Sequence, residues 1–324
     1  MNSINADFKK NYPAVDIVIC SRNNKDITSQ CIDSLLASSY PNYKIILVDD
    51  YSTDDSADFL EKKYPNIILI RNKKNLGTAK TRNVGINLSD GKYIITMDND
   101  ATISSEWILK MVELMESDES IGQAVGKILF FDDRQRIAAA GGSMYYRGKG
   151  YDIGFGEPDN GQYNQIRQVL YACTASSIIR RSALNQVGGF CDVYFHGYDD
   201  TDFSLLLNIA GYKVLYLPEI ISYHMVSKTV NQTIGKKRAY YAIRNRLLIM
   251  FRTYEFKSLI KHIPKNIYFT IKDCLLRNRD RILPAILSWF WLFFHLPMIF
   301  NQRRKIKKIR KLKDNKIHLL FNLQ

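Results

Sequence analysis

Short apolar runs alternate with amphipathic stretches along the first third of the chain. The apolar runs predict strands at residues 15–20, 44–48, 67–71 and 93–97. The stretches between them have helical spacing and predict helices at residues 27–38, 56–63 and 78–88. Short apolar strands that alternate with helices are typical of a mostly parallel sheet with helices on both faces. The pattern therefore predicts an α/β, Rossmann-like fold.

Beyond residue 103 the alternation is less regular. The pattern there predicts helices at residues 107–115 and 202–210, and strands at residues 125–131, 142–146 and 214–217. Near the C-terminus the composition changes. Residues 239–251 are apolar with interleaved arginines, and residues 282–300 are almost entirely apolar. We therefore expect the chain to end in a helical region that differs in kind from the sheet.

Polar side chains follow three of the predicted strands, at the point where each strand ends. They are Ser21, Arg22 and Asn23 after the first strand, Asp49 and Asp50 after the second, and Asp98, Asn99 and Asp100 after the fourth. Parallel sheets bind ligands at the carboxyl ends of their strands, so these groups are expected to converge on a binding edge. The alternative is that Asp and Asn stand there only because loops and helix caps favour them.

Asp98 and Asp100 have the spacing of a paired metal ligand. Residues i and i+2 of an extended segment share a face, so both carboxylates can point to one side. A divalent cation bound with a pyrophosphate needs such hard, anionic oxygen ligands. His224 is a candidate third ligand, because imidazole binds Mn²⁺-like metals, although an isolated histidine is more often an ordinary surface or core residue.

A second acidic cluster, Asp199, Asp200 and Asp202, leads into a predicted helix. Adjacent carboxylates repel each other, which raises a pKa and prepares one of them to act as a base. The alternative is that the acids only complement the positive N-terminal end of the helix dipole.

The order of these motifs resembles glycosyltransferase family 2, and more narrowly its rhamnosyltransferase-like members. The matching segments are residues 15–19, 21–23, 48–54, 75–77, 82–85, 97–100, 188–190, 199–202, 210–212 and 223–224. Together they cover about residues 14–228. The chain departs from the family at Asp199, where a glutamate is common.

The resemblance implies a GT-A fold and a set of roles. Ser21, Asp50, Arg82 and Asp98 would bind a nucleotide diphosphate sugar. Asp100 and His224 would hold a divalent metal, Mn²⁺ or Mg²⁺, and Asp200 would be the general base that deprotonates the acceptor hydroxyl. Residues 12–235 would form the catalytic domain, divided into a nucleotide-sugar-binding part at 12–130 and an acceptor part at 131–235.

The implied reaction is an inverting, metal-dependent transfer of a sugar to a hydroxyl of a glycan or lipid-linked acceptor. Two alternatives stay open. One is a polyprenyl-phosphate sugar transferase of the same fold. The other, from a different class, is a non-enzymatic protein that binds an anionic polymer, suggested by the net charge of +14.

That charge is concentrated at the C-terminus. Residues 236–324 hold 22 Lys and Arg against 4 Asp and Glu, a net charge of +18, whereas the first 235 residues have a net charge of −4. The densest run, residues 303–316, has nine basic residues and directly follows the apolar segment. An apolar segment would serve no purpose in a nucleic-acid-binding tail, so we expect no nucleic-acid partner.

The expected partner of residues 236–324 is instead an anionic membrane surface. Residues 282–300 have nearly the length that spans a bilayer, about 20 residues. Trp289 and Trp291 lie near the middle of this segment, whereas spanning helices keep Trp at the interfaces. We therefore expect a helix that lies in the membrane surface, with a buried capping helix or a true span as alternatives. Truncation after residue 233 should then leave a soluble catalytic domain.

The five cysteines are scattered and form no CxxC pair, which fits a reducing compartment. The N-terminus has no apolar segment typical of a secretory signal. We therefore expect a peripheral or monotopic protein at the cytoplasmic face of the cell membrane.

Overall fold

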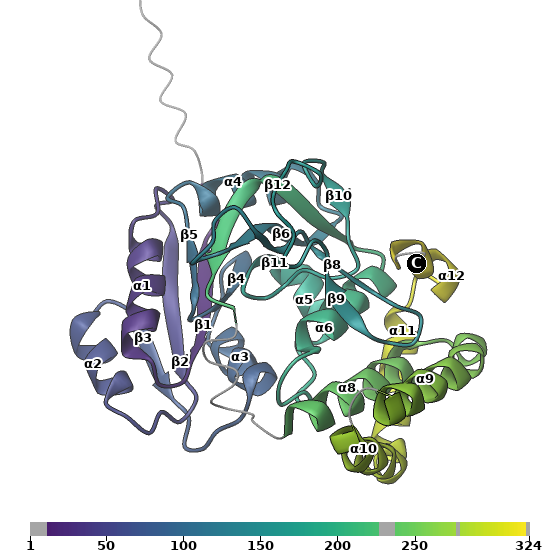
Figure 1. Ribbon diagram of the computed structural model, residues 1–324. Helices are drawn as coiled ribbons and strands as arrows, with labels where there is room; N and C mark the ends of the chain where they lie inside the picture. The colour runs from purple at the N-terminus through teal and green to yellow at the C-terminus, as the bar shows by residue number, and fades with distance from the viewer. Residues whose placement is uncertain (1–11, 227–236, 277–278, 322–324) are drawn as a thin grey trace, which may run out of the picture.

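The computed structural model describes residues 12–226, 237–276 and 279–321 (Figure 1). A ten-stranded mixed sheet forms its centre, with strand order β10-β12-β6-β11-β4-β1-β2-β3, while β5 pairs with β12 and β7 with β6. A separate two-stranded hairpin joins β8 (Gly142–Met144) to β9 (Gly150–Asp152). The predicted α/β architecture is thus confirmed.

The N-terminal half of the sheet is parallel. Its strands are β1 (Val15–Ser21), β2 (Tyr43–Asp49), β3 (Ile68–Arg71) and β4 (Tyr93–Asp98). The connecting helices are α1 (Lys25–Leu36), α2 (Ser56–Lys63) and α3 (Thr78–Asn87). Alternate side chains of β1 enter different cores: Ile17 and Ile19 pack on one face and Val18 on the other. Burial on both faces explains why these strands are continuous apolar runs.

The other half of the sheet is mixed. It contains β5 (Ala101–Ile103), β6 (Ile121–Phe130), β7 (Ile137–Ala139), β10 (Arg167–Gln168), β11 (Ser176–Arg180) and β12 (Lys213–His224). The helices of this half are α4 (Trp107–Ser117), α5 (Arg181–Val187) and α6 (Asp199–Ile209). Strand β11 runs antiparallel to both β4 and β6, and β12 runs parallel to β6.

The strand expected at residues 214–217 proves to be longer. Strand β12 continues past Pro218 to His224, with an irregularity in its pairing to β6 between Leu217 and Ile221. Pro218 lacks a backbone N–H and therefore falls where the ladder is interrupted. The expected end of the strand after residue 217 is thus a bulge inside one longer strand, and this strand carries His224 to the candidate site.

The C-terminal region is helical and packs against the catalytic body (Figure 1). It comprises α8 (Arg238–Thr253), α9 (Phe256–Leu276), the 3₁₀ turn η2 (Arg279–Arg281), α10 (Ile282–Phe294), α11 (Leu296–Ile309), α12 (Asp314–Ile317) and the 3₁₀ turn η3 (His318–Leu320). The expected boundary between residues 235 and 236 lies outside the described residues.

Helix α8 belongs to the core of the catalytic body. Its residues Leu247 and Leu248 are buried in the same hydrophobic cluster as Val18 of β1 and Phe203 of α6. The packing of α8 argues against the expectation that truncation after residue 233 leaves a soluble domain, because the cut would remove part of this core. Fully burying one such side chain is worth about 1.5–3 kcal/mol.

The apolar segment at residues 282–300 is not one straight helix, contrary to expectation. It bends by 67° where Arg279–Phe294 meets Leu296–Ile309, next to His295. Pro297 causes the break, because it has no N–H to donate and its ring clashes with the preceding turn. Within the described residues, no single helix is long and apolar enough to span a membrane. Among them, only this bent pair of helices, taken together, has the length and apolar composition of a membrane span.

Candidate active site

The candidate site lies where the strand order reverses between β1 and β4. At such switch points the connections on either side diverge and leave a crevice at the carboxyl ends of the strands. Ser21 ends β1 and Asp98 ends β4 at this point, and Asp50 follows β2 next to them, its backbone N–H donating to the carbonyl of Ser21 (2.7 Å). The structure thus brings together residues from three separate strand ends.

Asp98, Asp100 and His224 form a compact cluster. One ligand atom from each lies within 4.8 Å of the others. The pairing of β12 with β5 places His224 opposite Ala101, directly after the second carboxylate, and the N–H of Met225 donates to the carbonyl of Asp100 (2.9 Å). Two carboxylates and an imidazole within this distance suit a Mn²⁺-like cation, so the predicted metal ligands meet in space.

Burial and neighbouring charges alter the protonation of this cluster. Burial raises the pKa of Asp98, although the charge of Arg82 opposes the rise. Burial alone would lower the pKa of His224, but its contact with Asp100 (2.9 Å) and the nearby carboxylates outweigh burial and raise it. The same negative charge that raises these pKa values also favours the binding of a cation.

Asn99, which the sequence analysis left without a role, anchors the segment between the two aspartates. Its amide donates to Thr28 Oγ1 (2.9 Å) and to Ser21 Oγ (3.4 Å), and those two hydroxyls lie 3.0 Å apart. All three side chains are buried. Ser21, expected to contact the donor, is therefore also part of the support that orients Asp98 and Asp100. The sequence feature that could have indicated this supporting role is the position of Asn99 between two candidate metal ligands.

Asp50 binds protein groups with both carboxylate oxygens. Oδ1 accepts hydrogen bonds from the N–H of Leu76 (2.7 Å) and the amide of Asn72 (3.0 Å), and Oδ2 accepts one from the N–H of Gly77 (3.0 Å). Gly77 has φ +79°, and a Cβ there would meet the carbonyl oxygen of Phe195 at 2.3 Å. Asp50 therefore fixes the glycine turn that begins α3, and any donor contact comes in addition to this.

Arg82 links α3 to both acidic clusters. Its guanidinium is buried, forms an ion pair with Asp199, and lies 3.2 Å from Asp98. The ring of Phe190 covers it, with 5.0 Å between the guanidinium carbon and the ring centroid. Its Nε has no partner in the described part of the chain. Arg82 thus has a fixed position at the centre of the site.

The three acids of the first turn of α6 have different partners. Asp199 pairs with Arg82, and Asp202 is buried against Arg252 of α8 and accepts a hydrogen bond from Tyr194 (3.1 Å). Asp200 has no cation within ion-pair distance among the described residues, and only Thr201 donates to it (2.6 Å from its N–H). The geometry therefore separates Asp200 from its two neighbours.

The surroundings of Asp200 also raise its pKa. Burial, followed by the charges of Asp199 and Asp152, raises the pKa of Asp200 to about 7. Asp152 lies at the end of β9 and accepts a hydrogen bond from Tyr171 (2.9 Å). Asp152 was missed in the sequence because a lone acid in a glycine-rich stretch carries no motif. A carboxylate with a pKa near neutral pH is suited to act as a general base.

Comparison with known proteins identifies the family of the chain. The model of the family "Glycosyl transferase family 2" matches residues 16–188. The glucosyltransferase WfaP of Escherichia coli, named as acting on α-D-GlcNAc-diphosphoundecaprenol, is 26% identical over 76% of this chain and 95% of its own length. Poly(ribitol-phosphate) β-glucosyltransferase of Bacillus spizizenii is 38% identical over 33% of this chain but only 18% of its own length.

Solved structures share the fold at low identity. GalNAc-T7 with UDP, GalNAc and Mn²⁺ gives a TM-score of 0.64 at 13% identity, covering 89% of this chain and 58% of that one. The mannosyltransferase PcManGT of Pyrobaculum calidifontis, solved with GDP-Man and Mn²⁺, gives 0.57 at 14% identity, covering 97% and 89%. The narrower likeness to rhamnosyltransferases stays a prediction. The chain belongs to glycosyl transferase family 2 and is a glycosyltransferase of the GT-A fold.

Proposed function

We propose that this protein transfers a sugar from a nucleotide diphosphate sugar to an acceptor hydroxyl with inversion, and that Asp200 is the general base. The observation that carries the proposal is the difference among the three acids of α6. Asp199 and Asp202 are each paired with a buried arginine, whereas Asp200 has no such partner in the described chain and has a pKa near 7. Only Asp200 is therefore ready to accept a proton at neutral pH.

The donor would lie along the edge formed by Ser21, Asp50, Arg82 and Asp98. Asp100 and His224, together with Asp98, would hold Mn²⁺ or Mg²⁺, which supplies neutralisation of the charge that develops on the departing nucleoside diphosphate. Arg82 adds a fixed positive charge beside this cluster, and its buried Nε supports a role toward an anionic group of the donor.

An inverting transfer needs one base and no nucleophile from the enzyme, and Asp200 would supply that base. Asp200 would accept the proton of the acceptor hydroxyl while the oxygen attacks the anomeric carbon from the face opposite the leaving group. The new C–O bond forms as the bond to the nucleoside diphosphate breaks. No covalent intermediate on the enzyme is needed, so a second catalytic carboxylate is not required.

The acceptor would be a glycan or a lipid-linked sugar at the cytoplasmic face of the membrane. The substrate for which WfaP is named supports a lipid-linked acceptor, because this chain matches WfaP over 95% of its length. The exposed apolar faces of α9 and α10 and the basic helix α11 support contact with an anionic membrane surface. A transfer to a polyprenyl phosphate itself is the second candidate, because both acceptors share the lipid phosphate.

A panel of nucleotide sugars, incubated with the full-length protein and Mn²⁺ or Mg²⁺, tests the proposal. We expect one nucleotide sugar to be hydrolysed or transferred, and the activity to disappear with a chelator and return with added metal. Full activity in the presence of the chelator would contradict the metal assignment. The anomeric configuration of the product, read by NMR, decides between inversion and retention.

A further inference from the structure

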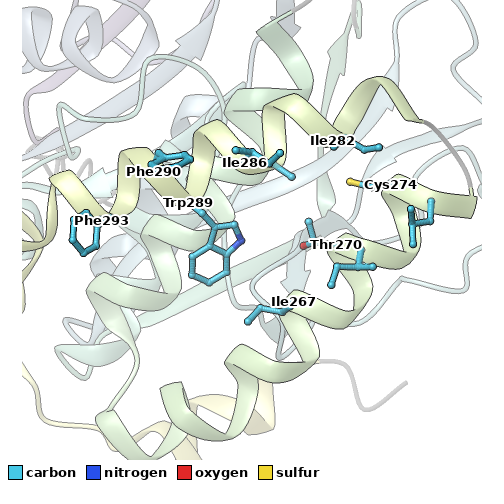
Figure 2. Close-up of a pocket in the computed structure, with 11 residues that line it drawn as sticks. Ile267, Thr270, Cys274, Ile282, Ile286, Trp289, Phe290 and Phe293 are labelled. Atoms are coloured by element: carbon cyan, nitrogen blue, oxygen red, sulfur yellow. The ribbon is translucent and has the colours of Figure 1, made fainter.

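An apolar groove of about 790 Å³ runs between α9 and α10, on the C-terminal helical region (Figure 2). Ile267 and Ile271 line it from α9, and Ile286, Trp289 and Phe293 line it from α10. In Figure 2 the Trp289 ring and the Thr270 side chain point into the space between the two helices. The groove is therefore bounded by two helices and is almost free of polar groups.

The groove opens onto an exposed apolar surface. Ile271 is 52% exposed, Phe290 59% and Phe293 67%. Soluble proteins rarely leave a contiguous surface of this kind uncovered, and such patches mark sites of interaction. The preferred occupant of the groove is therefore a hydrocarbon rather than a polar ligand.

A buried cation lies behind the floor of the groove. The Nη2 of Arg246 donates to Thr270 Oγ1 (2.5 Å), which is one of the groove-lining side chains. Arg246 is only 6% exposed, and its Nε has no partner in the described part of the chain. A buried charge that is incompletely satisfied is costly unless a counter-charge completes it. The site thus offers a complement to an anion next to an apolar channel.

A second arginine stands beside the first. Arg147, in the turn between β8 and β9, lies with its guanidinium carbon 4.2 Å from the ring centroid of Phe269 on α9. The side chain of Asn266, also on α9, donates to the backbone carbonyl of Arg147 (2.8 Å). Asp273 is the acid whose charge acts on Arg246, whereas Arg147 and Arg281 add positive charge. Of the described side chains whose charges act on Arg246, two are arginines and one is an aspartate.

The hairpin β8–β9 connects this cationic end to the candidate base. A Cβ on Gly148 would meet the carbonyl oxygen of Arg246 at 2.9 Å, so the hairpin turn lies directly on α8. At its other end the hairpin carries Asp152, whose charge acts on Asp200. The charge of Arg246 also acts on Tyr198, which precedes the acids of α6. The hairpin therefore has its turn against α8 at Arg246 and carries at its other end an acid whose charge acts on the candidate base.

We propose that the groove between α9 and α10 holds the hydrocarbon chain of a lipid-phosphate-linked acceptor, with its phosphate at Arg246 and Arg147 and its sugar hydroxyl toward Asp200. This inference rests on the proposed sugar transfer and assigns a binding site to its lipid-linked acceptor. A flat bilayer surface would not require a buried arginine behind the groove, and a docking apolar helix from a protein would not supply a phosphate. The β8–β9 hairpin, which links the turn beside Arg246 to Asp152 near the candidate base, favours a substrate over both.

Binding of undecaprenyl phosphate to the full-length protein in detergent micelles tests the proposal, with native mass spectrometry as the readout. Ala285→Trp fills the groove from α10, and Ile271→Trp obstructs it from an exposed position on α9 that tolerates a larger side chain. Leu287→Trp is the matched control, because Leu287 is on α10 and exposed but does not line the groove. Thermal melts of all three variants establish that they are folded.

We expect both groove variants to weaken undecaprenyl phosphate binding by about tenfold or more, and the control to stay within about twofold of the wild type. The wild type should bind uncharged undecaprenol more weakly, and Arg246→Gln should reduce that preference. Unchanged binding by the folded groove variants, or equal binding of the phosphate and the alcohol by the wild type, would overturn the proposal. Donor hydrolysis by the wild type, measured in parallel, reports separately on the proposed function.

Discussion

The Nε2 atom of His224 lies 2.9 Å from Oδ1 of Asp100, although the two residues are 124 positions apart in the sequence. Their proximity depends on β12, which crosses the sheet past its bulge and pairs with β5 immediately after the Asp98–Asp100 segment. The backbone N–H of Met225 strengthens the same junction. The cluster of candidate metal ligands is therefore fixed by sheet pairing rather than by a loop.

Substitution of the metal ligands should have graded effects. Asp100→Ala removes an anionic ligand, so we expect turnover to fall by more than the roughly 10–100-fold loss typical of residues that only support a ligand. His224→Ala should lose less, because two carboxylates remain. Mn²⁺ affinity measured by calorimetry should fall in the same order. Activity retained by Asp100→Ala at wild-type metal affinity would exclude this residue as a ligand.

Asn99→Ala should impair metal binding without touching a ligand. The change removes the hydrogen bonds to Thr28 and Ser21 that hold the segment between the two aspartates. We expect Mn²⁺ affinity to drop by about 10–100-fold, as for other residues that orient ligands. Higher metal concentrations should restore much of the activity. If affinity does not change, the segment is held by its backbone alone.

Asp202→Asn should destabilise the fold rather than impair the chemistry. Asp202 is fully buried against Arg252, and removing one member of a buried pair costs about 3–5 kcal/mol because the other charge is left unpaired. Denaturant unfolding should show this loss in the free energy of unfolding. The folded fraction should keep near-wild-type turnover. A stable but inactive Asp202→Asn protein would move the catalytic role away from Asp200.

The rate of transfer should depend on pH through Asp200. Burial and the neighbouring carboxylates raise the pKa of Asp200 to about 7, and only the deprotonated form can accept the acceptor proton. The value of kcat/KM should therefore rise as pH increases through about 7 and fall on acidification. A profile measured with saturating metal checks this. A kcat/KM that stays constant from about pH 5 to about pH 9 would mean that no such base limits the reaction.

The parallel half of the fold was predictable because its strands are buried on both faces and therefore appear as continuous apolar runs. The proximity of Asp98, Asp100 and His224 was predictable from the order of the motifs along the chain, whereas their roles stay a prediction. The length of β12 was not predictable. A proline usually marks the end of a strand, and only the pairing with β6 shows that β12 continues past Pro218. The bend beside His295 was not predicted, because the length and apolar composition of residues 282–300 do not reveal the helix break that Pro297 causes.

The ion-pair partners of the acids in α6 could not be predicted from the sequence, for a different reason. Asp199, Asp200 and Asp202 are alike in sequence, and only their partners distinguish them: Arg82 and Arg252 come from helices α3 and α8, far along the chain. Asp152 carried no motif at all. Such long-range pairs follow from tertiary packing, which local periodicity does not encode.

The most direct test of the central claim is the turnover of Asp200→Asn with the donor that the panel identifies. The substitution is nearly isosteric and keeps the hydrogen bonds from Thr201, so donor affinity and thermal stability should remain close to wild type. We predict that kcat falls by roughly 10²-fold or more, the contribution of general-base help, and that the rise in rate near pH 7 disappears. Wild-type turnover by Asp200→Asn would contradict the account and assign the proton transfer to another group.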